Sequence, residues 1–180
     1  MNQAPFIQGP NVILRKPNES DIQDRFDSGS SYEWVRMLGG DTRNMQPYTR
    51  EKAQKWFDDI NSKPLEWAIE YKGKCIGQAR LTVNTDDQRA RYAVGIFNDQ
   101  ILGQGIGTEV TKLVLSYAFE ILKLHRVDLK VLSYNTRAIA CYEKCGFIKE
   151  GIEREGALIE ARWESDLIMS ILEQEYYKDS

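Results

Sequence analysis

The sequence predicts a mixed α+β fold, in which a sheet of about seven strands is flanked by helices. Two observations support this. In the first half of the chain, apolar residues recur at every second position, which is typical of strands. In the second half, strand-like and helix-like segments alternate after a glycine-rich turn. We therefore expect an antiparallel meander, followed by strand–helix units that return to the same sheet.

The first half supplies the meander and two helices. Asn18 caps a helix that begins near Glu19, and Thr49 caps a second helix with one apolar face. Between them, residues 28–47 are predicted to form a loop with one helical turn. The strands expected in this half are residues 12–14, 65–71, 75–83 and 90–97.

The second half begins with the glycine-rich turn, residues 103–107, which leads into a helix with an apolar face reaching residue 124. Asn135 caps a short helix, and Gly146 ends it. The strands expected here are residues 127–131, 147–152 and 162–172.

The composition of the chain argues against several classes of function. The 180 residues fit a single domain over residues 1–180. The net charge of −3 and the absence of a long basic run argue against nucleic acid as a partner. No apolar stretch reaches the roughly 18 residues needed to span a membrane, and residues 1–10 do not resemble a signal peptide. The three cysteines lack zinc-site spacing, so we expect reduced thiols, no metal and a cytoplasmic location.

Glycine recurs at every second position from Gly103 to Gly107, between a predicted strand and a predicted helix. Glycine adopts positive φ without strain and lets a ligand approach the backbone closely. The helix that follows offers N–H groups without intrahelical acceptors and a partial positive charge. Such a turn can bind a phosphate or a pyrophosphate without a basic side chain.

Two other phosphate-binding loops do not fit this turn. A Walker loop requires a lysine directly before Ser or Thr, whereas Thr108 follows Gly107. The dinucleotide fingerprint requires G-x-G-x-x-G in an opening βαβ unit, but here the spacing is G-x-G-x-G after a meander. A flexible strand-to-helix turn without any ligand is the structural alternative.

A second motif lies between residues 135 and 147. It consists of Asn135, Ala138, Tyr142, Lys144, Gly146 and Phe147. With Gly105 and Gly107, it resembles the motifs of the GNAT superfamily of acetyl-CoA-dependent N-acetyltransferases, Q/R-x-x-G-x-G/A and N-x-x-A followed by Y-x-K-x-G-F. The resemblance covers residues 12–172. Residues 11–15 and 160–172 look like the branch that contains the RimJ/RimL-like ribosomal-protein acetyltransferases.

This resemblance implies a twisted sheet whose fourth strand, residues 92–97, splays from the fifth, residues 127–132, in a V shape. It implies acetyl-CoA as co-substrate, with the pyrophosphate on the turn and the pantetheine arm along the fourth strand as an added strand. Asn135 can bind CoA or cap its helix. The expected cofactor-binding residues are Gly95, Ile96, Phe97, Leu102, Gly103, Gln104, Gly105, Ile106, Gly107, Thr108, Asn135, Ala138 and Lys144.

The resemblance also places Tyr142 as the general acid that protonates the leaving thiolate. A phenol with a pKa of about 10 can donate to a thiolate whose conjugate acid has a pKa of about 8.5, if it is well positioned. The structural alternative is a core tyrosine, since Ile139 and Tyr142 share a helix face.

The general base is not identified. Where many relatives carry Glu, this chain has Arg91, which cannot accept a proton. Asp86, Asp87, Glu70 or a water relay could substitute. His125, the only histidine, follows a long helix and is interpreted as a partner of its dipole. Leu102 is a second departure, since the motif often has Gln or Arg there.

The acceptor is expected to be a primary amine: a protein N-terminus, a polyamine or an aminoglycoside-like antibiotic. Aromatic and sulfur side chains that could line its pocket, unless they are core residues, are Tyr32, Trp34, Met37, Trp56 and Trp67. Carboxylates that could attract a cation, unless they are merely solvated, are Asp41, Asp86, Asp87 and Glu160. A homodimer is one assembly that the sequence allows. Two rival functions are a CoA-binding regulatory module without turnover and a phosphate-binding protein unrelated to CoA.

Overall fold

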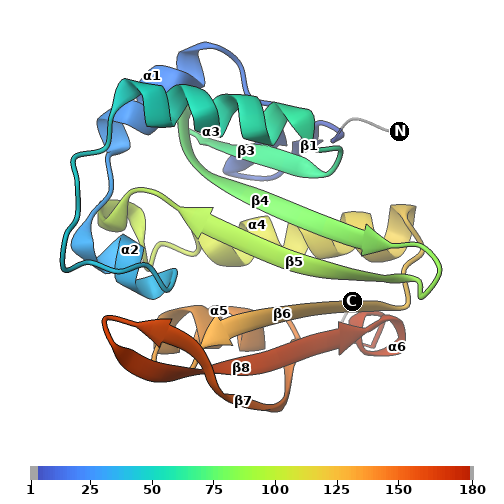
Figure 1. Ribbon diagram of the computed structural model, residues 1–180. Helices are drawn as coiled ribbons and strands as arrows, with labels where there is room; N and C mark the ends of the chain where they lie inside the picture. Colours follow the sequence, from blue (N-terminus) through green and yellow to red (C-terminus); the bar gives the residue numbers. More distant parts are fainter. Residues whose placement is uncertain (1–3, 179–180) are drawn as a thin grey trace. The chain divides into compact units, whose positions relative to one another are not determined.

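The computed structural model describes residues 4–178, which form an eight-stranded mixed sheet flanked by helices. The strand order is β1-β2-β3-β4-β5-β6-β8-β7 (Figure 1). The strands are β1 (Ile7–Gln8), β2 (Val12–Arg15), β3 (Glu66–Tyr71), β4 (Lys74–Asn84), β5 (Arg89–Ile96), β6 (Arg126–Leu132), β7 (Ile148–Ile159) and β8 (Arg162–Leu172). The α-helices are α1 (Ser20–Ser28), α2 (Tyr32–Met37), α3 (Arg50–Ser62), α4 (Ile106–Ser116), α5 (Thr136–Lys144) and α6 (Glu173–Tyr176).

The predicted fold class is confirmed. Thr49 caps α3 by accepting a hydrogen bond from the N–H of Lys52, and Asn18 accepts one from the N–H of Ser20, where α1 begins. The helical turn expected in the 28–47 loop is α2. The sheet has eight strands because β1, only two residues long, pairs with β2. Such a short strand leaves no periodic signal in the sequence.

The long helix differs from the prediction, and the parallel strand pair has a short register. The expected helix divides into α4 and a π-helical turn at Tyr117–Ile121. Strands β5 and β6 run parallel, and their register covers only three residues, from Arg89 opposite Arg126 to Arg91 opposite Asp128. Strands β5 and β6 are therefore paired only over the first three residues of each strand.

The described residues group into two units. Unit 1 contains residues 4–31, 46–81 and 93–113, and unit 2 contains residues 32–45, 82–92 and 114–178. Each unit collects segments that lie far apart in the sequence. The extent of the domain, 1–180, stays a prediction.

In unit 1, helices α1 and α3 lie side by side, and α3 also contacts β3 (Figure 1). Helix α3 buries Ala53 and Ile60, while β3 contributes Trp67 and Ile69, neither of which is exposed. Burial of a large apolar side chain contributes about 1.5–3 kcal/mol, so these contacts hold the helix layer on the sheet.

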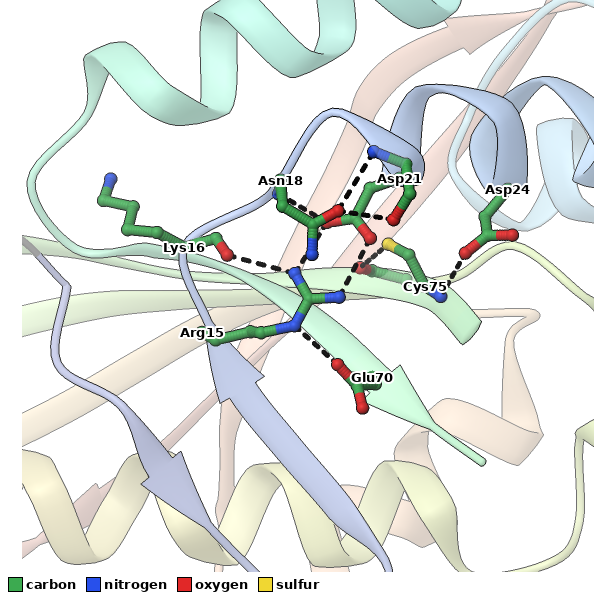
Figure 2. A network of polar contacts seen from close by, with 9 residues as sticks. Arg15, Lys16, Asn18, Asp21, Asp24, Glu70 and Cys75 are labelled. Carbon is green, nitrogen blue, oxygen red and sulfur yellow. Dashed lines mark hydrogen bonds and ion pairs between the residues drawn. The ribbon is translucent and has the colours of Figure 1, made fainter. Parts of the chain in front are cut away.

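A buried polar network fixes the start of α1 to the sheet (Figure 2). The Arg15 guanidinium on β2 donates to both carboxylate oxygens of Asp21, at 2.7 and 2.9 Å, and to Glu70 on β3, at 2.6 Å. Asp21 is fully buried, and its hydrogen bond to Arg15 raises the pKa of that guanidinium further. One turn later, Asp24 accepts the N–H of Cys75 on β4 at 2.9 Å. Helix α1 is therefore hydrogen-bonded to β2 and β4, and Arg15 links it indirectly to β3.

In unit 2, β8 lies between β6 and β7, and both pairings are antiparallel (Figure 1). Leu129, Met169 and Ile171 form the centre of its core and are at most 2% exposed. The hairpin between β7 and β8 turns at Glu160 and Ala161, which both have positive φ. The carboxylate of Glu160 accepts hydrogen bonds from Thr42, which holds the loop after α2 against this hairpin.

Candidate active site

The glycine-rich turn in unit 1 has the conformation that the sequence predicts. Gly103 and Gly105 have φ values of +79° and +81°, in the left-handed region. A Cβ at either position would meet no atom within 4 Å, so conformation, and not lack of space, requires glycine there. The carbonyl of Gly105 accepts the N–H of Glu109 at 3.0 Å, and α4 begins at Ile106. The turn is therefore followed directly by the N-terminus of α4.

The remaining residues of the turn differ in exposure. Leu102 is half-buried and ends a short 3₁₀ helix, Asp99–Ile101. Gln104 is exposed, whereas Ile106 is buried and anchors the first turn of α4. Gly107 and Thr108 also lie in the first turn of α4. The predicted phosphate-binding segment is thus a continuous backbone surface at a positive helix end.

Glu109 fixes the start of α4 to the sheet, a role that the sequence analysis missed. Its carboxylate accepts the backbone N–H groups of Asn11 and Val12, at 2.7 and 3.0 Å. Partial burial raises the pKa of Glu109, but the hydrogen bond from the Asn11 side-chain amide, at 2.9 Å, and the two backbone bonds outweigh it and lower the pKa. The anionic form is therefore stable, and it holds the glycine turn at a defined position beside β2.

The carboxyl end of β5, the predicted pantetheine strand, also belongs to unit 1. Gly95 and Ile96 are half-buried, and the N–H of Phe97 donates to the carbonyl of Ile76 at 2.8 Å. A Cβ on Gly77 of β4 would lie 2.3 Å from the carbonyl oxygen of Gly95. Glycine at position 77 therefore permits the close approach of β4 to this end of β5.

The ring of Phe97 is held by two neighbours from the helix layer. The Arg25 guanidinium of α1 lies 4.2 Å from its centroid and 3.8 Å from that of Tyr48. Trp56 of α3 packs edge-on against Phe97 with a centroid separation of 5.7 Å, and its indole N–H donates to Gln78. Burial lowers the pKa of Arg25, yet a guanidinium stays charged in proteins. Trp56, considered for the acceptor pocket, thus supports the end of β5.

Helix α5 carries the second predicted motif and lies in unit 2. The side-chain oxygen of Asn135 accepts the N–H of Ala138 at 3.2 Å, and its amide group donates to the carbonyl of Met37 at 3.4 Å. The helix cap considered for Asn135 is therefore present. Lys144 is exposed in the last turn, and Gly146, with φ +90°, follows the helix end.

Tyr142 is 8% exposed and packs among aromatic rings. The centroids of Tyr92 and Phe147 lie 6.3 and 5.8 Å from that of Tyr142. Within the described part of the chain, the Tyr142 hydroxyl has no hydrogen-bond partner. Burial raises its pKa above the ordinary value. The phenol is therefore protonated and unengaged at neutral pH, the state that a proton donor needs.

Arg91 forms an ion pair that the sequence analysis did not anticipate. Its guanidinium donates to Asp128 at 2.8 Å, and Arg89 donates to the other oxygen of the same carboxylate at 2.7 Å. Asp128 is 1% exposed in β6, directly opposite Arg91. A charged residue inside the apolar stretch Val127–Leu129 was the available signal, because a buried carboxylate needs a partner.

The other base candidates have partners or lie in exposed turns. Glu70 accepts from Arg15, and Asp87 pairs with Asn84 in the β4–β5 turn, which also holds the exposed Asp86. This turn precedes β5, whereas the glycine turn follows it. His125 is exposed, and its backbone bridges two elements of unit 2, donating to Gln88 and accepting from Glu173.

The aromatic residues considered for an acceptor pocket separate into distinct environments. Trp67 is fully buried and donates to the carbonyl of Pro5 at 2.8 Å, so it is a core residue, the alternative given for it above. Tyr32 is largely exposed at the start of α2. The same helix contacts α5 through an ion pair of 3.1 Å between Glu33 and Arg137.

The two carboxylates considered for attracting a cation at this end of unit 2 already have partners. Asp41 pairs with Arg43, whose hydrogen bonds lower the pKa of the Asp41 carboxyl to about 2. Glu160 accepts from Thr42, and this hydrogen bond lowers the pKa of Glu160. Asp41 is therefore paired with a cation, whereas the hydrogen bonds from neutral Thr42 leave the charge of Glu160 in place.

Two further features are absent from residues 4–178. No helix there is both long and apolar enough to cross a bilayer. No three side chains among its His, Cys, Asp and Glu residues gather as they would around a metal ion. The predicted site residues thus fall into two sets, 95–108 in unit 1 and 135–144 in unit 2.

Comparison with known proteins gives a family match over most of the chain. Residues 11–148 match the family model described as an acetyltransferase (GNAT) domain. The probable N-acetyltransferase YjcK of Bacillus subtilis is 41% identical over 180 residues, covering 93% of this chain and 97% of the relative. The spermidine N(1)-acetyltransferase of Vibrio cholerae is 28% identical over 149 residues, covering 77% of this chain and 86% of that protein.

Solved structures share the fold at lower sequence identity. A GNAT-family acetyltransferase from Bacillus anthracis superimposes with a TM-score of 0.81 at 18% identity, covering 94% of this chain and 99% of the other. The spermidine N-acetyltransferase of Vibrio cholerae, in a structure with CoA and spermine, has a TM-score of 0.76 at 24% identity, covering 94% and 99%.

Proposed function

Since the chain belongs to the GNAT acetyltransferase family, we propose that it transfers the acetyl group of acetyl-CoA to a primary amine by direct attack, with Tyr142 as the general acid. The activity is that of an N-acetyltransferase. The observation that carries the cofactor assignment is the backbone of the glycine turn, where Gly103 and Gly105 adopt positive φ immediately before α4.

The pyrophosphate of CoA is proposed to bind the N–H groups of residues 102–108, of which that of Leu102 is also donated to the carbonyl of Asp99 at 3.2 Å. Backbone donors at a helix N-terminus stabilise a diphosphate through hydrogen bonds and the helix dipole together. Because these donors belong to the main chain, Leu102 can replace the more usual Gln or Arg without loss of the contact. Glu109 keeps the donors in place through its hydrogen bonds to β2.

The pantetheine arm is proposed to run along Gly95, Ile96 and Phe97 and to pair with their backbone as an added strand. The short parallel register of β5, limited to Arg89–Arg91, supports this proposal. The ring of Phe97, held by Arg25 and Trp56, then fixes the end of the strand that the arm follows. Asn135, Ala138 and Lys144 are proposed to contact CoA from α5.

In the proposed reaction, the lone pair of the amine nitrogen attacks the thioester carbonyl carbon, and the carbon–sulfur bond breaks. Tyr142 donates its phenolic proton to the departing thiolate, while the amine loses a proton to a base that is not assigned. Burial raises the pKa of Tyr142. The thiol whose thiolate forms in the same low-dielectric surroundings also has a raised pKa. The pKa difference between the phenol and the thiol, which sets the free-energy cost of the proton transfer, therefore changes little.

The acceptor is proposed to be a protein N-terminus, a polyamine or an aminoglycoside-like amine. The relatives support this range, since they include spermidine and aminoglycoside N-acetyltransferases. Membership of the RimJ/RimL-like branch, a homodimeric assembly and a cytoplasmic location are proposed on the sequence motifs and on three cysteines that form no disulfide.

Thiol release from acetyl-CoA in the presence of single amines tests the proposal. The panel comprises spermidine, an aminoglycoside and a short peptide with a free N-terminal serine. Amine-dependent release of CoA thiol is expected for at least one of them. Saturable CoA binding without thiol release from any amine would instead indicate a regulatory module, and failure to bind CoA would refute the cofactor assignment.

A further inference from the structure

A pocket on unit 1, away from the residues assigned above, lies between α3 and strands β3 and β4. Its volume is about 310 Å³, which is at the lower end of the range for small-molecule sites, roughly 300–1,000 Å³. Lysine, arginine, aromatic and acidic side chains line it, among them Tyr48, Lys55, Trp56, Lys63, Glu66 and Arg80.

The pocket carries a surplus of positive charge. Its lining includes Lys52, Lys55, Lys63 and Arg80, against two carboxylates, Asp59 and Glu66. Glu66 is 2% exposed, and the ammonium group of Lys63 lies 3.3 Å from its carboxylate, so these two charges compensate each other. The lining then has three remaining cations, Lys52, Lys55 and Arg80, and one remaining carboxylate, Asp59.

Two of these cations are not engaged elsewhere. Within residues 4–178, neither Lys55 on α3 nor Arg80 on β4 has a hydrogen-bond or ion-pair partner. Both side chains are exposed at the pocket. A guanidinium presents a planar fork that matches a carboxylate or a phosphate, and an ammonium adds a point charge beside it.

The wall between these cations is aromatic. Trp56 and Tyr48 both line the pocket and are only half-buried. The indole N–H of Trp56 is already donated to Gln78. Arg25 covers part of the Tyr48 ring, and Trp56 packs edge-on against Phe97. The parts of both rings that stay exposed at the pocket can contact a flat apolar body.

We propose that this pocket binds a small molecule that combines a carboxylate or phosphate group with a flat apolar body, and that its occupancy alters the affinity for CoA. Arg80 and Lys55 hold the anionic group, and Trp56 and Tyr48 contact the body. The binding itself is independent of the acetyltransferase reaction, whereas the effect on CoA rests on the proposed pantetheine site.

Two contact paths inside unit 1 lead from the pocket to the end of β5. Trp56 touches Phe97 directly, with centroids 5.7 Å apart. Tyr48 contacts Arg25, which in turn lies over the ring of Phe97. A ligand that reorients Trp56 or Tyr48 therefore acts on the residue that ends the proposed pantetheine strand, and linkage requires CoA to act reciprocally on the ligand.

The binding test uses phenyl phosphate and benzoate, with neutral benzamide for comparison. The indole N–H resonance of Trp56, assigned by Trp56→Phe, is followed by NMR during each titration. A saturable shift with a dissociation constant of about 1 mM or tighter, that is about −4 kcal/mol or stronger, is expected for at least one anion. The absence of saturation for both anions, or an equal response to benzamide, would overturn the site.

Two substitutions test whether the anion binds in this pocket. Arg80→Gln should weaken binding of the responding anion about tenfold, which corresponds to 1.4 kcal/mol. The matched control is Lys72→Gln, because Lys72 is an exposed cation of unit 1 outside this pocket. Equal weakening by both variants would place the anion elsewhere. Unchanged affinity in Arg80→Gln would assign any phosphate binding to another site, the glycine turn included.

The coupling test measures CoA affinity by calorimetry with and without a saturating concentration of the responding anion. A change of about fivefold or more in the CoA dissociation constant is expected, the lower end of ordinary allosteric coupling. The change should disappear in Arg80→Gln. Anion binding at the pocket with unchanged CoA affinity would refute the coupling and leave the binding site intact.

Discussion

The glycine turn of unit 1 and helix α5 of unit 2 differ in the chemical groups on which their proposed functions depend. The turn offers main-chain N–H groups, so its side chains matter only through the backbone conformation that they permit. The proposed function of helix α5 depends on the side-chain hydroxyl of Tyr142, whose burial raises its pKa. The comparison predicts that the turn tolerates changes in side-chain chemistry but not in φ, whereas α5 is sensitive to the loss of one oxygen atom.

The largest effect is expected for Tyr142→Phe. Removing the hydroxyl removes the proposed proton donor, so kcat should fall by about 10²–10⁴-fold while the CoA dissociation constant changes little. Steady-state kinetics and calorimetry give the two values. Tyr176→Phe is the control, because it removes a phenol that pairs with Glu120 elsewhere in unit 2. Similar rates for Tyr142→Phe and wild type would exclude Tyr142 as the acid.

The same tyrosine predicts a pH dependence. Burial raises its folded-state pKa above the unfolded value of about 10, so folding favours the protonated phenol. The associated stabilisation is complete below pH about 10 and is lost as pH rises above that value. Tyr142 ionisation should therefore cause no alkaline fall in kcat below pH 10. A fall with a midpoint near pH 8 that disappears in Tyr142→Phe would contradict this.

The next largest effect is expected for the ion pair between Arg15 and Asp21 in unit 1. Asp21→Asn leaves the Arg15 guanidinium without its buried charge partner, and the free energy of unfolding should drop by about 3 kcal/mol. Denaturant unfolding measures the loss. Glu70→Gln, at the more exposed side of the same guanidinium, should cost clearly less. Equal losses would mean that burial of Asp21 is not what makes the pair important.

A smaller effect is expected from Gly105→Val. A valine at φ +81° is strained by roughly 1–2 kcal/mol, and relief of that strain distorts the donors of the turn. CoA affinity should fall about 5–30-fold, as calorimetry can show. Gly73→Val is a matched control, since Gly73 has φ +76° and equally open surroundings in the β3–β4 turn. Loss of CoA affinity in both variants would point to general destabilisation.

The smallest effect separates the two interpretations of Asn135. Asn135→Ala removes the cap of α5 and should cost about 1 kcal/mol of stability, whereas Asn135→Ser retains a capping oxygen and should cost less. If Asn135 also binds CoA through its amide, both variants weaken CoA affinity. If it acts only as a cap, Asn135→Ser binds CoA like the wild type.

Most of the fold could be predicted because helix ends and strand patterns depend on residues that are close together in the sequence. Thr49, Asn135 and Gly146 each act within a few residues, and the structure places them at helix ends as expected. Strand β1 was missed because its two residues depend on pairing with β2. The length of α4 was overestimated because the apolar face continues through the π-helical turn.

The features of the site that were missed all depend on contacts between distant segments. Glu109 holds residues 11 and 12, nearly a hundred positions away, and no sequence period links them. Asp128 meets Arg91 only because β5 and β6 pair in one parallel register. The sequence left Trp67 open as a core or a pocket residue, because an aromatic side chain fits both environments, and only the structure shows that it is in the core.

The position of the pyrophosphate in a crystal structure of the CoA complex tests the central claim most directly. The account predicts that phosphate oxygens accept hydrogen bonds from backbone N–H groups of residues 102–108, with Gly103 and Gly105 retaining positive φ. A complex in which CoA is fully ordered but its pyrophosphate is bound by side chains elsewhere, with this turn unoccupied, would contradict it.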